Sequence, residues 1–197
     1  LRERWRASRI GVRFSPPLFL DGAIVLIDGV ANQAGAVVGL DPAMTLVYRQ
    51  EYAKTLGSHK APTVLLPQEW LANTLPQSHI VKDADPYHFL PHCTEKTNEP
   101  SSIGLWQQVY ERMGLKLSVQ ASGCCGMSGT YGHEAKNAET SDVIYKQSWA
   151  PTVAKLNASG RLLADGYSCR SQVKRKEGVT VLHPLQALLA VVRNANA

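Results

Sequence analysis

The sequence predicts an α/β fold, in which a mostly parallel sheet, or more than one such sheet, is flanked by helices. In the second half of the chain, short apolar runs of strand length alternate with longer amphipathic stretches of helix length. This alternation is typical of parallel strands joined by helical crossovers. A length of 197 residues and a hydrophobic fraction of 44% allow one substantial domain, or two small ones that share a core.

The first half carries the weaker signals. Pro16 and Pro17 stop any helix that begins in the basic start of the chain. Asp41 is a suitable N-cap for a helix that begins at Pro42 and ends near Gly57. The elements expected here are a helix over 18–32, a strand over 36–40, a helix over 42–57, a strand over 63–66, a short helix over 67–75 and a polar connector over 77–86.

The second half is more regular. Leu105, Val109 and Met113 recur at the spacing of one helix face, which predicts an amphipathic helix. Gly114 follows as a helix terminator. The expected strands are 87–90, 115–119, 162–164 and 179–182, and the expected helices are 101–113, 134–156, 169–176 and 184–193.

All four cysteines follow predicted strands of this second half. They lie in three short polar segments, at Cys93, at the pair Cys124 and Cys125, and at Cys169. Because the carboxyl ends of parallel strands meet at one edge of a sheet, we expect the sulfur atoms to come together there. Thiols in loops near helix N-termini are stabilised as thiolates and can react or bind metal.

Cys124 and Cys125 stand between two glycines, which is difficult to explain as core packing because adjacent side chains do not face one core. Four thiolates are enough for one four-iron cluster or one zinc ion. Adjacent cysteines are awkward joint ligands of a regular cubane, since their side chains diverge. An irregular cluster, and a site that uses only some of the thiols, therefore both stay open. The predicted metal ligands are Cys93, Cys124, Cys125 and Cys169.

A glycine-rich segment surrounds and follows the cysteine pair. Its glycines permit unusual backbone angles and a row of inward N–H groups, which would stabilise a thiolate, cluster sulfides or an anion. Most glycine-rich segments are only tight turns, so the glycines alone would be weak evidence for a binding site. The interpretation depends on the cysteines next to them. The predicted cofactor-binding positions are Gly123, Gly126, Gly129 and Gly132.

No catalytic residue is identified from the sequence, and three side chains are candidates. His133 and His183 are possible proton carriers or ligands, although a capping or hydrogen-bonded histidine is the more common occurrence. Arg170 is placed to hold an anionic substrate or to offset cluster charge. For Lys174 and Arg175, a solvated helix face explains the charge at least as well.

The formal net charge is +5 and the pI about 9.1, with basic runs at 2–9 and 174–176. Neither run is interleaved with aromatic residues or set in a recognition motif, so nucleic-acid binding is not expected. No apolar stretch is long enough to cross a bilayer, and no secretory signal is present. Reduced thiols then favour a cytoplasmic location, with a peripheral position at the inner membrane as the alternative. Because the sequence starts at Leu1 without Met, we expect a piece of a longer protein.

Four segments of the sequence resemble a known family. They are Gly-Cys-Cys-Gly-Met-Ser-Gly-Thr-Tyr-Gly-His-Glu over 123–134, Ser148-Trp149, Gly-Tyr-Ser-Cys-Arg-Ser-Gln-Val-Lys-Arg over 166–175, and His-Pro-Leu-Gln-Ala-Leu-Leu over 183–189. They resemble the C-terminal cysteine-rich (CCG) region of large bacterial FAD-linked oxidases of the D-lactate or D-2-hydroxyglutarate dehydrogenase kind. The wider family includes the cysteine-rich component of heterodisulfide reductase and the iron–sulfur components of glycolate oxidase and anaerobic glycerol-3-phosphate dehydrogenase. The resemblance runs from residue 18 to the end and is most specific from His92 onward.

The resemblance implies two pseudo-repeated CCG-type halves. On this basis 1–17 is a basic lead-in, 18–86 a truncated or degenerate first half without cysteines, and 87–197 the second half that carries all four. Many family members end in Cys-x-x-Cys, whereas this chain has Cys169-Arg170-Ser171-Gln172. One ligand of the wider pattern is therefore missing.

The resemblance also implies cofactors and partners. FAD and a small 2-hydroxyacid substrate would bind an N-terminal domain of the parent protein, and a ferredoxin-like segment would precede this region. The chain alone would then be inactive and would serve as an iron–sulfur or electron-transfer region of the parent oxidoreductase. Two alternatives remain open: a thiol–disulfide redox module, and a docking domain whose cysteines are relics.

Overall fold

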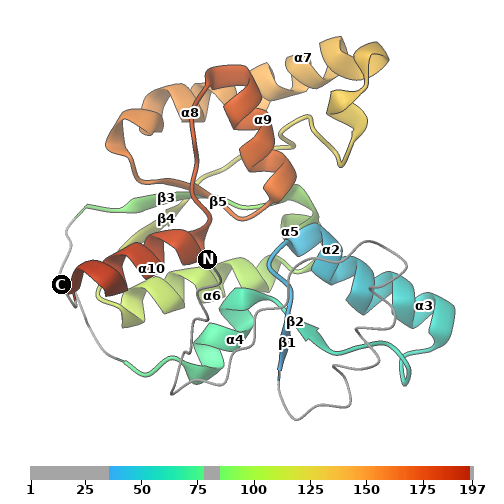
Figure 1. Cartoon of the computed structure of the whole chain (residues 1–197), viewed down its shortest axis with the longest axis vertical. Helices are drawn as coiled ribbons and strands as arrows, with labels where there is room; N and C mark the ends of the chain where they lie inside the picture. Colours follow the sequence, from blue (N-terminus) through green and yellow to red (C-terminus); the bar gives the residue numbers. More distant parts are fainter. Residues whose placement is uncertain (1–35, 78–84, 196–197) are drawn as a thin grey trace, which may run out of the picture.

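The computed structural model describes residues 36–77 and 85–195, and it has the α/β architecture that the sequence predicts (Figure 1). Two sheets are present in this part of the chain, and every strand pairing within them is parallel. The smaller sheet pairs β1 (Val37–Val38) with β2 (Val64–Leu65). The larger sheet has the order β4-β3-β5, with β3 (Tyr87–Leu90), β4 (Leu117–Val119) and β5 (Leu162–Ala164).

Helices form all the connections between these strands. α2 (Pro42–Leu46), a π-helical turn η1 (Val47–Glu51) and α3 (Tyr52–Leu56) join β1 to β2, and α4 (Pro67–Thr74) follows β2. The second half contains α5 (Cys93–Asn98), α6 (Pro100–Arg112), α7 (Ala138–Ser148), α8 (Ala150–Leu156), α9 (Tyr167–Glu177) and α10 (Pro184–Ala195). Three 3-10 turns lie between them: η2 (Tyr131–His133), η3 (Ala135–Asn137) and η4 (Asn157–Ser159).

The larger sheet is covered by helices on both faces, with α7, α8 and α9 above it and α6 and α10 below it in Figure 1. Alternation along the strands explains this layering, because successive side chains point to opposite faces. Leu90 and Ala164 belong to the core cluster of the upper layer, which contains Trp149. Phe89 and Leu163 belong to the lower cluster, which contains Trp106. The sheet therefore separates two apolar cores.

Three elements differ from those expected. The helix expected over 134–156 is divided, because Pro151 in the first turn of α8 has no N–H to continue α7. The strand expected over 179–182 is reduced to a single bridge between Leu182 and Leu163. The helix α5 was not expected, because its sequence has no apolar periodicity. The helix expected over 18–32 and the lead-in over 1–17 lie outside the described residues.

The two halves repeat a structural unit. In the first half, Leu66 N donates to the Glu69 side chain at 2.7 Å, just before α4. In the second half, His183 N donates to the Gln186 side chain at 2.8 Å, just before α10. Each of these helices begins with a proline directly after the capped residue.

The strands that precede these helices repeat in the same way. Val38 pairs with Leu65, and Gly39 N donates to the Leu65 carbonyl at 2.9 Å. Leu163 pairs with Leu182, and Ala164 N donates to the Leu182 carbonyl at 3.0 Å. The unit β1–α2–β2–α4 thus has its counterpart in β5–α9–α10. The division of the chain at 86 and 87 stays a prediction.

None of the described helices combines the length and the apolar character that a membrane span requires.

Candidate cysteine site

Cys93 is the first residue of α5, immediately after the turn that leaves β3. His92 caps this helix, because its Nδ1 accepts the Thr94 N–H at 3.2 Å. The His92 N–H in turn donates to Asp165 Oδ1 at 2.9 Å. Cys93 is therefore held at the carboxyl edge of the sheet by a helix cap and by a contact to the turn after β5.

Cys124 and Cys125 lie in the irregular segment that follows β4. Gly123 fixes the start of this segment, since its N–H donates to Ser148 Oγ at 2.6 Å and its carbonyl accepts Trp149 Nε1 at 3.1 Å. Lys96 also binds this segment, at Ser122. These contacts tie the cysteine pair to the end of α7 and to α5.

Cys169 lies in the first turn of α9 and is 1% exposed. Gly166 precedes this helix as its N-cap residue. A Cβ at Gly166 would lie 2.3 Å from His92 Cδ2 and 3.0 Å from Cys169 Sγ. Glycine is therefore required here, because any side chain would separate the Cys93 and Cys169 segments.

The structure brings the four cysteines together. Their side chains form a hydrogen-bonded series in which Cys93 contacts Cys124, Cys124 contacts Cys125, and Cys125 contacts Cys169. Cys93 and Cys124 are half-buried, whereas Cys125 and Cys169 are buried. All four are free thiols. The site thus opens to solvent at one end and is closed at the other.

Hydrogen bonding within the series places negative charge on Cys124. Its pKa is lowered to about 2, because the thiols of Cys125 and Cys93 both donate to it, with further support from the Gly126 N–H and from His92. The same contacts raise the pKa of Cys93 and of Cys125, since a donor must keep its proton, and burial adds to both. The resulting charge state is a single thiolate, Cys124, which accepts hydrogen bonds from the protonated thiols of Cys93 and Cys125.

The geometry does not suit a single metal ion. Within 36–77 and 85–195, no three His, Cys, Asp or Glu side chains form a group that could hold one. A lone zinc ion needs four donors around one point, at about 2.3 Å for sulfur. Cysteine thiolates are also the ligands of iron–sulfur clusters, so the donor set has the chemistry of a cluster site.

The predicted glycine positions have distinct surroundings. Gly126 has φ +83°, and a Cβ there would lie 2.3 Å from the Ser141 carbonyl oxygen. At Gly132, a Cβ would lie 2.7 Å from Ser141 Oγ. Gly129 has φ +64° with open space around it, and Gly123 faces Ser148. Gly126 and Gly132 thus let the loop pack closely against α7. A role of these glycines in binding a cofactor stays a prediction.

Gln172 occupies the place of the second cysteine in the Cys-x-x-Cys pattern, and it is fully buried. Its Nε2 donates to Ser141 Oγ at 2.9 Å, and Ser141 Oγ donates to the Gly126 carbonyl at 2.7 Å. Because that carbonyl can only accept, the direction of both bonds is fixed. The position therefore ties α9 to α7 and to the cysteine loop.

The three catalytic candidates lie in different places. His133 is exposed on η2, and no hydrogen bond described for it reaches a cysteine. Arg170 is half-buried beside Cys169, and its guanidinium donates to the carbonyls of Ala164 at 3.0 Å and Asp165 at 2.6 Å. Burial lowers its pKa. Arg170 is thus partly committed to the end of β5.

His183 is buried below the sheet rather than exposed at the site. Its ring packs edge-on against Trp106, with centroids 5.9 Å apart, and its Nδ1 accepts the Leu185 N–H at 3.1 Å. Burial, reinforced by the charge of Arg170, lowers its pKa to about 4. His183 is therefore a neutral capping residue at physiological pH, and a catalytic role for it stays a prediction.

Sequence reasoning missed a buried acidic pair beside the cysteines. Glu95 is 0% and Asp165 2% exposed, and the interaction of their carboxyl groups raises the pKa of Asp165. Gln68 Nε2 and Ser102 Oγ donate to Glu95 Oε1 at 2.6 and 2.5 Å. The only signal in the sequence was the closeness of Glu95 to Cys93 and of Asp165 to Cys169, because an acidic residue is normally assigned to the surface.

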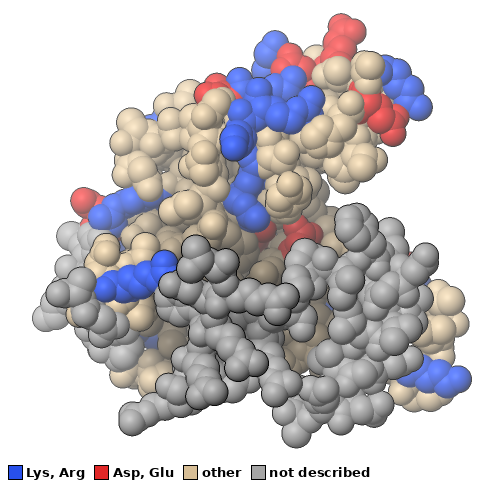
Figure 2. Space-filling view, in the orientation of Figure 1, with Lys and Arg blue, Asp and Glu red and all other residues tan. Residues whose placement is uncertain are grey.

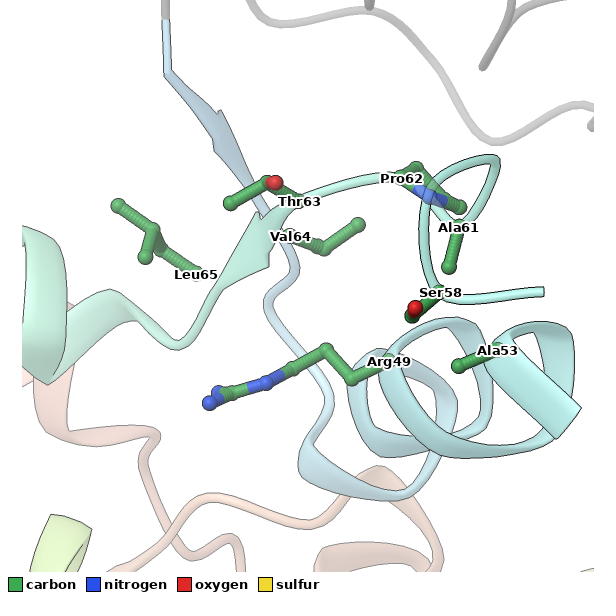
Figure 3. Close-up of a pocket in the computed structure, with 8 residues that line it drawn as sticks. All are labelled: Arg49, Ala53, Ser58, Ala61, Pro62, Thr63, Val64 and Leu65. Carbon is green, nitrogen blue, oxygen red and sulfur yellow. The ribbon is translucent and has the colours of Figure 1, made fainter.

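A hollow of about 270 Å³ lies away from the cysteines, between α3 and β2, where it is lined by Arg49, Ser58 and Thr63 among others (Figure 3). The Arg49 guanidinium is already paired with Glu69 at 3.0 Å and Glu99 at 3.5 Å. It is therefore not available to bind an anion.

Basic side chains gather over α9 and α7, at the top of the view in Figure 2, with acidic groups among them. Lys146 and Lys176 both pair with Asp142, at 2.6 and 2.9 Å. Arg175 donates to the Gly132 carbonyl at 2.9 Å. Much of this charge is therefore neutralised locally or used to hold the loop.

Parallel strands whose carboxyl edge carries a series of thiols form a cysteine-rich α/β unit. The chain is 57% identical over 163 residues to D-2-hydroxyglutarate dehydrogenase of Pseudomonas putida, covering 83% of this chain and 16% of that relative. It is 47% identical over 169 residues to the enzyme of the same name from Escherichia coli, covering 85% and 16%. It is also 34% identical over 77 residues to one component of the anaerobic glycerol-3-phosphate dehydrogenase of Escherichia coli, covering 38% and 18%.

The chain is therefore homologous to one segment of the D-2-hydroxyglutarate dehydrogenases, and the family resemblance drawn from the cysteine segments is confirmed. It spans about 16% of the length of these relatives. No family model matches the chain, and no solved structure matches it.

Proposed function

We propose that the chain is the cysteine-rich electron-transfer region of a D-2-hydroxyacid dehydrogenase that uses FAD and an iron–sulfur cluster. The observation that carries this proposal is the hydrogen-bonded series of four thiols, which come from three segments far apart in the sequence. The names of the relatives support a dehydrogenase parent. The chain by itself is not catalytic.

In this proposal Cys93, Cys124, Cys125 and Cys169 hold the cluster. Bound there, the cluster accepts and passes on single electrons. The remaining residues of the site keep the thiols in place: His92 fixes the start of α5, and the bonds from Gln172 through Ser141 fix the Cys125–Gly126 segment. Since no cysteine stands at position 172, this chain supplies four thiolates.

The rest of the parent supplies the other parts of the reaction. Following the family resemblance, we place FAD and the 2-hydroxyacid substrate in an N-terminal domain and a ferredoxin-like segment before this region; the chain spans only 16% of its relatives, which leaves room for these parts. The first half, 18–86, is a degenerate CCG-type half that supports the second. The parent acts in the cytoplasm.

The test is metal analysis of the full-length parent, purified without oxygen. The proposal expects iron and acid-labile sulfide, broad visible absorbance from the cluster, and loss of part of the iron in Cys124→Ser and Cys169→Ser variants. Ser159→Ala is the matched control, because Ser159 lies on η4, away from the thiols, and should leave the iron content unchanged. A colourless parent with stoichiometric zinc would contradict the proposal.

A second candidate is a thiol–disulfide function, favoured by the contact between half-exposed Cys93 and the Cys124 thiolate. Formation of that disulfide would release two electrons to the parent's flavin and one proton from the Cys93 thiol. Thiol counting before and after mild oxidation separates this from a cluster, because only the disulfide consumes two thiols without iron. If the Cys124→Ser and Cys125→Ser variants of the full-length parent keep their turnover, neither redox function holds. That result would favour a docking domain whose cysteines are relics.

A further inference from the structure

One carboxylate joins the first half of the chain to the cysteine helix. Asp41 Oδ1 accepts the N–H groups of Ala43 at 3.0 Å and Met44 at 3.3 Å, as an N-cap of α2. Its other oxygen, Oδ2, accepts the Tyr167 N–H at 2.8 Å. Tyr167 is the first residue of α9, 126 positions later in the sequence. Asp41 thus caps two helices at once, one from each repeated unit.

The second bond also places the carboxylate beside the cysteine segment of α9. Tyr167, which it binds, is two residues before Cys169 and three before Arg170. The charge of Asp41 therefore lies close to the inner end of the thiol series.

We propose that Asp41 is a positioning residue of the cysteine site: it anchors the first turn of α9, and with it Cys169, and supplies a fixed negative charge beside the site. The inference rests on the proposed function and gives the first half of the chain a role in it. The cap of α2 needs only Oδ1. The second bond to Tyr167 is what couples this residue to the site.

Asp41→Asn is the informative variant. Asparagine is as good an N-cap as aspartate, so α2 keeps its start. The amide nitrogen that replaces one carboxylate oxygen cannot accept the Tyr167 N–H, and the charge is lost. Asp142→Asn is the matched control, because it removes the same charge from an aspartate that pairs with lysines of α7 and α9 and does not bind the first turn of α9.

The test uses the full-length, iron-loaded parent. Removing a nearby negative charge stabilises the reduced form of the site. Asp41→Asn should therefore increase the equilibrium constant for reduction about tenfold, which is a rise of about 59 mV in the reduction potential of a one-electron couple. The peptide that begins α9 should also exchange its amide hydrogens faster, as read by mass spectrometry. Asp142→Asn should change neither quantity.

The outcomes separate this inference from the proposed function. A parent that binds no iron would overturn the proposed function. An iron-loaded Asp41→Asn parent with the wild-type potential and unchanged exchange at α9 would overturn the role of Asp41 alone. An Asp41→Glu variant that restores the potential would support the charge as the cause.

Discussion

The carboxyl groups of Glu95 and Asp165 interact in the interior of the protein, where each keeps one oxygen, Glu95 Oε2 and Asp165 Oδ2, without any other partner among the described residues. Two carboxylates in contact cannot both be ionised, and in the folded chain Asp165 keeps its proton. Burial, followed by the bond to Glu95, raises the pKa of Asp165 well above its ordinary value. Since Glu95 belongs to the Cys93 helix and Asp165 to the turn before Cys169, this proton helps to join two cysteine segments.

Asp165→Asn should keep this junction, because the amide NH₂ can donate to Glu95 in place of the Asp165 proton while its oxygen still accepts the His92 N–H. Folding holds the Asp165 proton that the unfolded chain releases above pH 4, so wild-type stability falls as pH rises from there. The variant loses that dependence and should be at least as stable as wild type at pH 7. Urea unfolding at several pH values measures both. Equal pH slopes in the two proteins would contradict the proton on Asp165.

Asp165→Ala provides the contrast. It leaves the His92 and Gly166 N–H groups without their acceptor, and it removes the carboxyl group that interacts with Glu95, which then keeps only Gln68 and Ser102 as described partners. Unsatisfied buried groups cost about 1–3 kcal/mol each. We expect a loss of about 3 kcal/mol in the free energy of unfolding, where Asp165→Asn loses none.

His183 predicts a separate acid sensitivity. Its pKa of about 4 in the folded state lies below the ordinary value of 6.5. The unfolded chain therefore binds a proton first as pH falls, and stability decreases between pH 6.5 and 4, by at most about 3 kcal/mol. His183→Asn keeps an acceptor for the Leu185 N–H and does not titrate. Its unfolding free energy should lack this fall, and an unchanged acid profile would exclude His183 as the source.

Two glycine substitutions distinguish close packing from backbone strain. Gly126→Ala forces a Cβ to 2.3 Å from the Ser141 carbonyl at φ +83°, and we expect a loss of at least about 2 kcal/mol. Gly129→Ala has a similar φ of +64° but open space, so the loss should be about 1 kcal/mol. Urea unfolding of the two variants gives the comparison. Equal losses would mean that packing against α7 is not the constraint.

Cys124 should react as a thiolate far below neutral pH. Its pKa of about 2 keeps it ionised at pH 5, whereas an ordinary thiol of pKa about 8.5 is almost fully protonated. In the reduced, metal-free chain, the rate of Cys124 alkylation by iodoacetamide should be nearly constant from pH 5 to 8, as followed by peptide mass spectrometry. Cys93→Ala removes one donor and should raise that pKa. A wild-type rate that rises tenfold per pH unit would show an ordinary thiol.

The sheet and its connections were largely predictable from the sequence. The strands over 87–90 and 162–164 have the expected bounds, because short apolar runs between turn residues leave few alternatives. The helix α5 was missed because Cys-Thr-Glu-Lys-Thr-Asn shows no apolar face. Its buried residue is Glu95, and the contacts to Gln68 and Ser102 that make this burial possible come from elsewhere in the chain.

The site was predictable from the sequence to about the same extent as the fold. Parallel topology was enough to expect Cys93, Cys124 and Cys169 at one edge. The groups that hold them there were not predictable. Aspartate is normally a surface residue, and Asp41 and Asp165 acquire their roles only through partners that are distant in the sequence. The histidines followed local rules, since His92 and His183 both cap helices in the structure.

The order of the thiols along the chain restricts when they can be used. Cys93 leaves the ribosome first, and Cys169 appears only after two further crossovers have been synthesised. Until β5 pairs with β3, Cys125 lacks its inner neighbour Cys169, and the earlier thiols remain open to oxidants. Any group bound by all four must therefore be inserted after translation of this region is complete, and the cell has to protect the early cysteines until then.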